Sequence, residues 1–185
     1  MKLTERGSGL YLEGLVEGDV RFTNMAARPT GSQWEDPNNI KHAYVVNIHD
    51  KEIADALAGY GFNVKERVKS DTGEFDAFTL EFRAYPGVRV NAKTGKEEVW
   101  PKVMLKSVSS DSYKRLDIPE FSEVDSVNIE SANIRFHLYH NKRYNRNIAV
   151  IDELWVQLKA NSGRPDEDYY ESMLNPSYND EIPFE

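Results

Sequence analysis

The fold of this chain is decided by a long strand and its return: Val124-Asp-Ser-Val-Asn-Ile-Glu-Ser-Ala-Asn-Ile-Arg-Phe-His-Leu138, then Ile148-Ala-Val-Ile-Asp-Glu-Leu-Trp-Val-Gln-Leu158. Apolar and polar side chains alternate along both segments, which is the period of a strand with one face buried. The residues between them, Tyr139 to Asn147, are basic and rich in Asn, as in a hairpin loop. This pattern predicts two long antiparallel strands joined by a cationic turn.

Earlier segments add further strands and one helix. Asp50 is placed to cap a short helix over Lys51–Tyr60, because an Asp side chain can accept bonds from the first free N–H groups of a helix. The turn Ser70-Asp-Thr-Gly73 separates two apolar runs and predicts a hairpin. The further predicted strands are Leu10–Phe22 (single or as a bulged pair), Ala43–His49, Asn63–Val68, Phe75–Tyr85 and Val99–Val108.

Six or more strands with one early helix predict a mainly β protein. The best match is an elaborated OB-fold, a five-stranded antiparallel barrel with extra strands and one short helix. A β-sandwich fits the same strand spacing and is the alternative. We expect residues 1–163 to form the OB-fold domain and residues 164–185 to form a flexible acidic tail.

The tail explains the acidity of the chain. Residues 166–185 hold seven acidic side chains and no Lys, Arg or His, so this segment has too little apolar surface to fold alone and should stay extended. The whole chain carries −8. Subtracting the −7 of the tail leaves −1 for residues 1–165, which contain all 23 Lys and Arg residues. The cations of the body are therefore available to form a local basic surface.

Several chemical classes find no support in the sequence. There is no cysteine, no long apolar run and no apolar secretory signal after Met1, so we expect a cytoplasmic protein. No phosphate-binding glycine loop or nucleophile motif occurs. His137 and His140 lie three positions apart on a predicted strand, where such spacing gives opposite faces. We therefore expect no enzyme activity, no cofactor and no metal site.

Cationic and aromatic residues are interleaved in several segments. Binding a single nucleic-acid strand needs cations for the phosphates and aromatic faces for the bases. Alternation predicts that Trp100, Lys102 and Lys106 share an outer strand face with Met104, while Val103 and Leu105 face the core. Arg83, Tyr85 and Arg89 form a weaker cluster. The candidate nucleic-acid contacts are Trp34, Trp100, Lys102, Lys106, Tyr113, Lys114, Arg115, Lys142, Arg143, Tyr144 and Arg146.

Each candidate also has a structural interpretation. Trp100 precedes Pro101 and could cap the core, and Trp34 could anchor its own loop. A basic hairpin tip such as Lys142–Arg146 is often only a solvated turn.

The tail ends in Asp180-Glu-Ile-Pro-Phe184, and this tip resembles the acidic end of single-stranded DNA-binding proteins. The strand Asp125–His140 with its return Ile148–Leu158 also resembles phage-encoded members of that family. The resemblance implies a non-catalytic OB-fold protein that coats single-stranded DNA in replication, recombination and repair, in the host cytoplasm.

The resemblance also implies that Asp180, Glu181, Ile182, Pro183 and Phe184 dock replication or recombination proteins. In the bacterial family members Phe is the last residue, whereas here Glu185 follows Phe184 and moves the terminal carboxylate by one position. A phage-encoded partner is therefore the expected reader of this tail. A homodimer in which each tail shields the groove of its neighbour is possible.

Two other functional classes remain open from the residues alone. The first is a β-sandwich interaction module whose acidic tail is its functional peptide, which would bind no oligonucleotide. The second is a nuclease that uses Mg²⁺ held by scattered carboxylates.

Overall fold

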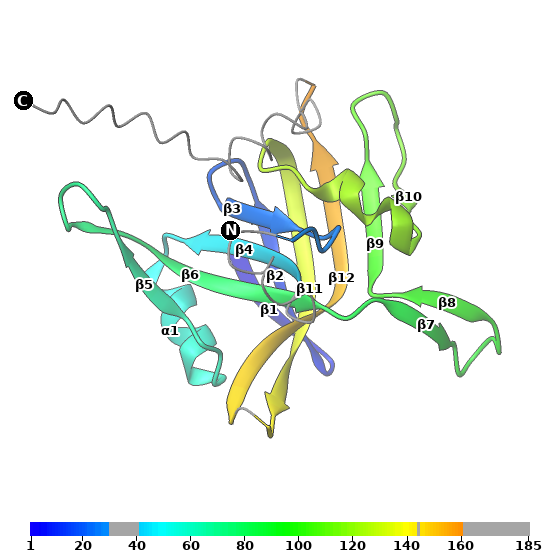
Figure 1. Ribbon diagram of the computed structural model, residues 1–185, viewed down its shortest axis with the longest axis horizontal. Coiled ribbons are helices and arrows are strands. Elements are labelled where there is room, and N and C mark those ends of the chain that lie inside the picture. The colour runs from blue at the N-terminus through cyan, green and yellow to red at the C-terminus, as the bar shows by residue number, and fades with distance from the viewer. Residues whose placement is uncertain (30–40, 144, 161–185) are drawn as a thin grey trace, which may run out of the picture.

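The structure is a computed structural model that describes residues 1–29, 41–143 and 145–160 (Figure 1). The described part of the chain is mainly β, as the sequence predicts. The first half contains β1 (Lys2–Arg6), β2 (Gly9–Leu15), β3 (Val20–Asn24), β4 (His42–Ile48), α1 (Lys51–Gly59), β5 (Lys65–Val68) and β6 (Phe75–Ala84). The second half contains β7 (Gly87–Val90), β8 (Glu97–Trp100), β9 (Lys102–Lys106), β10 (Lys114–Arg115), the 3-10 helix η3 (Ile118–Val124), β11 (Ile129–Asn141) and β12 (Arg146–Leu158).

Ten of the strands form one sheet. Its main path runs β1-β2-β11-β12-β6-β4-β3, with β5 paired to β6 and with β9 paired to both β12 and β10. The strands β2 and β3 near the two ends of this path belong to one segment, Gly9–Asn24, and are separated only by a turn closed by Asp19 N–H donating to Val16 O. Gly18 takes a positive φ of 91° in this turn, which glycine adopts at little cost. One segment thus pairs with β11 at one end and with β4 at the other.

The strand β12 pairs with different neighbours along its length. It is antiparallel to β11 from end to end. On its other side it runs parallel to β6 at Ala149 and Val150, and then parallel to β9 from Glu153 to Gln157. The sheet is therefore mixed, with these two parallel pairings added to the antiparallel strands that the sequence predicts. A two-stranded ribbon of β7 and β8 projects beside the base of β9 (Figure 1).

The core lies under this curved sheet. Phe82 of β6 packs edge-on against Phe136 of β11, with ring centroids 4.9 Å apart, and Phe62 after α1 contacts Phe136 at 5.3 Å. Such perpendicular pairs favour the edge-to-face geometry of aromatic quadrupoles. Both Phe82 and Phe136 are fully buried, so they are core residues rather than surfaces for a ligand.

Most predicted elements are confirmed, and three boundaries are wrong. The predicted strand Val124–Leu138 begins only at Ile129, because Asp125 turns inward to accept backbone hydrogen bonds. The predicted strand Val99–Val108 is divided at Pro101, which has no N–H to donate to a ladder. The hairpin loop is shorter than Tyr139–Asn147, because β11 continues to Asn141 and β12 begins at Arg146. Within the described residues, no helix is long and apolar enough to cross a membrane.

The helix α1 gives a direct test of the local folding argument. The Asp50 side chain accepts the N–H of Glu52 at 2.8 Å and that of Ile53 at 3.4 Å, while Ala54 and Leu57 bury the inner face. We predict that Asp50→Ala lowers the free energy of unfolding by about 1 kcal/mol. Asp50→Ser keeps a capping oxygen and should therefore retain most of the wild-type stability. Equal unfolding midpoints in urea for wild type and Asp50→Ala would contradict this assignment.

Candidate nucleic-acid interface

A groove of about 950 Å³ crosses the outer face of β3, β4 and β6 and reaches the turn end of the β11–β12 hairpin. We call it the β4–β6 groove. Strand alternation explains why charged side chains enter it: Leu80, Phe82 and Ala84 of β6 are buried in the core, so Glu81 and Arg83 point outward. Its cationic lining comes from Arg21 (β3), Lys41 (before β4), Lys65 (β5), Arg83 (β6) and Arg146 (β12).

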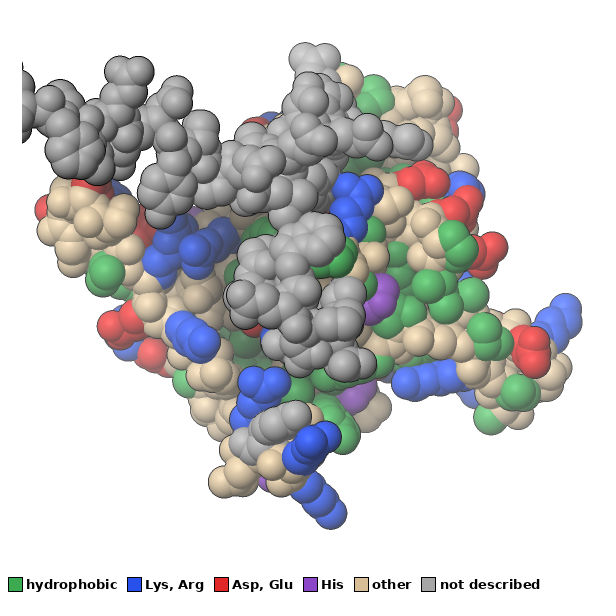
Figure 2. Space-filling view, viewed as in Figure 1, with side chains coloured by type: hydrophobic (Ala, Val, Ile, Leu, Met, Phe, Trp, Pro, Cys, Tyr) green, Lys and Arg blue, Asp and Glu red, His purple; other side chains and the backbone are tan. Residues whose placement is uncertain are grey.

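The groove is electropositive. Among the described residues that line it there are five Lys or Arg side chains and one carboxylate, Glu81, which pairs with Arg83. Burial lowers the pKa of Lys41, and the nearby positive charges of Arg83 and Arg146 lower this pKa further, against the opposing effect of Glu81. A cation whose pKa is lowered by other cations lies in a region of positive potential. Figure 2 shows Lys and Arg side chains on this face from the β5–β6 side down to the hairpin tip.

Aromatic groups lie beside these cations. Phe22, His42 and Tyr85 line the groove, and Tyr85 is 51% exposed. Asn63, Asn141 and Asn147 add polar groups to the same lining. The groove therefore combines cations, accessible ring faces and amide side chains, which are the groups that hold a nucleic-acid strand.

One side of the groove is fixed by a buried carboxylate. Asp125, which is 2% exposed, accepts the backbone N–H of Met25 at 2.5 Å and that of Ala26 at 3.0 Å. Burial raises the pKa of this carboxyl, and the two backbone bonds and the charges of Arg28 and His42 act in the opposite direction. His42 Nδ1 lies 2.6 Å from Met25 O. These contacts tie the start of the segment between β3 and β4 to the end of η3.

The other side is fixed by Asn147, close to the tip of the β11–β12 hairpin. Its Nδ2 donates to Gly61 O at 2.7 Å, and its Oδ1 lies 2.8 Å from His140 Nδ1. Gly61 has a φ of 90°, and a Cβ there would lie 3.1 Å from Asn147 Nδ2. The close approach of this glycine connects the hairpin to the end of α1.

The candidate residues of the hairpin lie beside this groove. Arg146 lines it, while Lys142 and Arg143 are exposed at the tip. Tyr144 and Trp34 lie outside the described residues, as does the predicted docking segment Asp180–Phe184.

The candidates on β9 form a second surface. Val103 and Leu105 are buried, so Lys102, Met104 and Lys106 face outward as predicted. Lys102 Nζ lies 4.6 Å from the ring centroid of Trp155 on β12, and Tyr113 meets the same ring edge-on at 5.1 Å. We call this surface the Trp155 face.

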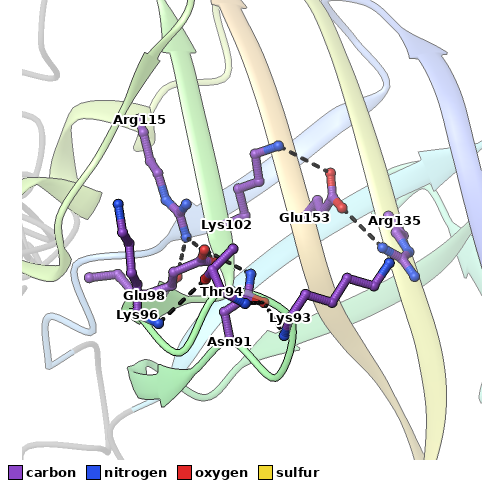
Figure 3. A network of polar contacts seen from close by, with 10 residues as sticks. Asn91, Lys93, Thr94, Lys96, Glu98, Lys102, Arg115, Arg135 and Glu153 are labelled. Atoms are coloured by element: carbon purple, nitrogen blue, oxygen red, sulfur yellow. Dashed lines mark hydrogen bonds and ion pairs between the residues drawn. The ribbon is translucent and has the colours of Figure 1, made fainter.

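Three other candidates have mainly structural contacts. Trp100 belongs to the β7–β8 ribbon rather than to the face of β9, because Pro101 divides the predicted strand, and Arg89 lies 4.9 Å over its ring. Lys114 Nζ pairs with Glu120 Oε1 at 2.6 Å. Arg115 donates to Val99 O at 2.8 Å and lies 3.8 Å from Glu98 (Figure 3). The last two residues hold β10 against η3 and the ribbon.

His137 and His140 are engaged in ordinary hydrogen bonds. His137 Nδ1 lies 2.9 Å from Asp152 Oδ1, and His140 contacts Asn147. Across residues 1–29, 41–143 and 145–160, no group of three or more His, Asp or Glu side chains is arranged to hold a metal ion.

Part of the groove cannot be recognised in the sequence. Arg21, Lys41 and Lys65 are single cations on different strands, and only the pairing of β3, β4, β5 and β6 brings them together. Arg83 and Tyr85, in contrast, belong to a cluster that the sequence pattern already indicates. Trp155 could have been recognised as outward-facing, because it alternates with the buried Leu154 and Val156.

Comparison with known proteins gives a remote likeness. No protein-family model matches the chain, and no curated protein matches its sequence. A C-terminally truncated single-stranded DNA-binding protein from bacteriophage Enc34 is similar in structure, with 13% identity and a TM-score of 0.47 over 84% of this chain and 88% of that one. The same protein in complex with single-stranded DNA gives 13% identity and a TM-score of 0.42, over 84% of this chain and 89% of that one.

The single-stranded DNA-binding protein gp2.5 of bacteriophage T7 gives 12% identity and a TM-score of 0.34, over 95% of this chain and 98% of that one. These are phage proteins of the class that the sequence resembles. At such low identities and scores, the case for function rests on the side chains of this chain.

The anchor at Asp125 can be tested by mutation. Asp125→Ala leaves the N–H groups of Met25 and Ala26 without their acceptor, so we predict a loss of about 2 kcal/mol in the free energy of unfolding. Glu123→Ala, two positions earlier on η3, is the control and should change little. Chemical denaturation measures both, and an Asp125→Ala protein as stable as wild type would contradict the anchor.

Proposed function

We propose that this chain binds single-stranded DNA without sequence preference and holds it in the β4–β6 groove. The observation that carries the proposal is the composition of the groove, where Arg21, Lys41, Lys65, Arg83 and Arg146 surround Phe22 and Tyr85. The cations neutralise phosphates, and the rings stack with bases, whose faces are similar for every base. Sequence tolerance follows from this mode of contact.

The strand order supports the proposal. Taking Gly9–Asn24 as the first strand, β4 and β6 are the second and third, and β11 and β12 are the fourth and fifth. In an OB-fold, oligonucleotides bind the face of the second and third strands, between the loop after the first strand and the loop joining the last two. The β4–β6 groove occupies the corresponding face, between the segment after β3 and the hairpin tip.

The hairpin and the loop candidates complete the site in this proposal. Lys142 and Arg143 at the tip follow the phosphates beyond Arg146, and Tyr144 and Trp34 contribute stacking faces. Lys102, Lys106 and Tyr113 belong to the Trp155 face, while Lys114 and Arg115 hold β10. The protein has no catalytic step in this role and coats exposed strands in replication, recombination and repair in the cytoplasm.

The acidic tail has two roles in the proposal. Residues 166–185 carry −7 and can compete with DNA for the cationic groove. The tip Asp180–Phe184 docks replication or recombination proteins.

The groove predicts a specific change in salt dependence. Each phosphate contact to a single strand contributes about 0.7 to the slope of log affinity against log salt. The double variant Arg21→Gln/Lys65→Gln should therefore bind oligo-dT more weakly and lower the magnitude of this slope by about 1.4. Titrations of labelled oligo-dT at several salt concentrations measure it.

The matched control is Lys51→Gln/Lys69→Gln, which changes the net charge equally at exposed positions of α1 and of the β5–β6 turn. It should leave the slope nearly unchanged. If both double variants reduce the slope equally, binding depends on net charge rather than on the groove. If the wild-type protein binds no oligo-dT at low salt, the chain has another function, such as a protein-interaction module.

Removing residues 166–185 tests the competing role of the tail. The remaining chain carries −1 instead of −8, so its affinity for oligo-dT should rise, most strongly at low salt. Unchanged or weaker binding would contradict the proposal that the tail competes with DNA. Partner docking would then be its remaining role. Incubating labelled DNA with the full-length protein and Mg²⁺ is the control for nuclease activity, and degradation would contradict the non-catalytic role.

A further inference from the structure

We propose that the Trp155 face is a second contact for the same DNA strand, which leaves the β4–β6 groove along β12 and is held again at Trp155. This inference rests on the proposed function and extends it. It predicts that long oligonucleotides use a surface that short ones do not reach.

The Trp155 face places a cation and two aromatic rings together. Lys102 Nζ lies 4.6 Å from the Trp155 ring centroid, and the Tyr113 centroid lies 5.1 Å from it. Trp155 Nε1 donates to Glu153 Oε2 at 3.2 Å, which fixes the ring plane. Trp155 and Tyr113 are both partly exposed. A base that stacks here has a cation beside it for its phosphate.

A second cation lies across the neighbouring strand. Arg135 Nη1 of β11 donates to Glu153 Oε1 at 3.0 Å, and Lys102 Nζ lies 3.9 Å from Glu153 Oε2 (Figure 3). The Arg135 guanidinium also lies 5.8 Å from the Tyr11 ring centroid on β2. A Cβ at Gly9 would lie 2.9 Å from Arg135 Nε, so this glycine leaves room for the side chain. Glu153 thus holds two cations side by side.

The β12 strand connects the two surfaces. Ile148 lines the groove, and Val150 pairs with the groove residue Arg83. After an irregularity at Asp152, the outer side of β12 continues through Glu153 to Trp155. Trp155 lies five positions after Val150, which corresponds to ~16 Å along an extended strand. A bound DNA strand must therefore extend beyond the groove to reach Trp155.

The carboxylates along this path are each paired with a basic group. Asp152 contacts His137 at 2.9 Å, and Glu153 contacts both Arg135 and Lys102. Pairing reduces their repulsion of phosphates. The charge pattern fits a nucleic-acid strand better than an acidic or apolar protein surface, because Lys102 and Arg135 lie beside the Trp155 and Tyr11 rings.

The test uses full-length protein in which Trp155 is the sole tryptophan, Trp34→Phe/Trp100→Phe. Tryptophan fluorescence and the anisotropy of a labelled oligo-dT are followed together over lengths of about 4 to 16 nucleotides, the range that one OB-fold binds. We expect anisotropy to report binding at every length, whereas Trp155 quenching begins only with the longer oligonucleotides.

The possible failures are distinguishable. Binding by anisotropy with no Trp155 quenching at any length overturns this inference and leaves the groove proposal intact. Absence of binding at every length overturns the proposed function itself. Trp155 emission that changes with protein concentration and not with DNA assigns this face to a second copy of the chain, and also overturns the inference.

A variant in the otherwise wild-type chain gives a second measurement. Trp155→Leu should weaken binding of the longest oligonucleotide about tenfold and leave the shortest unaffected. Trp155→Phe should bind the longest oligonucleotide nearly as tightly as wild type, because it keeps a stacking ring. Equal losses at all lengths, with unchanged thermal stability, would contradict a separate second contact.

Discussion

The architecture depends on the pairing of β12. Ala149 and Val150 of this strand pair with β6, Glu153 to Gln157 pair with β9, and nearly its whole length pairs with β11. These hydrogen bonds cannot slip by one residue without turning Leu154 and Val156 out of the core and Trp155 into it. The register of one strand therefore fixes both the base of the β4–β6 groove and the position of the Trp155 face.

The two surfaces differ in how their charges are balanced. In the groove, five described cations face one carboxylate, so positive potential is left for a polyanion. On the Trp155 face, Glu153 already holds Arg135 and Lys102. A phosphate must compete with that carboxylate, while a base can stack on the ring. Under the proposed function, this difference would make the groove the main source of electrostatic attraction to DNA, and the Trp155 face a site where stacking matters more.

Local patterns in the sequence predict the elements well, because each depends on neighbouring residues. Asp50 begins α1, and the turn before Phe75 joins β5 to β6. Contacts between residues that are far apart in the chain cannot be predicted from local sequence patterns. Asp125 looks like part of a strand, yet it binds Met25 a hundred positions earlier. The groove cations Arg21, Lys41 and Lys65 are isolated in the sequence, and only strand pairing unites them. The outward position of Lys102 was predictable, whereas its contact with Trp155 depends on a parallel pairing that alternation does not encode.

The central claim is that single-stranded DNA lies in the β4–β6 groove. Its most direct test is photocrosslinking of a short oligo-dT carrying one 5-iodouracil to the full-length protein, with the modified residue identified by mass spectrometry. The account predicts crosslinks to aromatic residues of the groove, first of all Tyr85, which directly follows β6 and is half exposed. Crosslinks confined to the β7–β8 ribbon or to the opposite side of the sheet at β1 would contradict it.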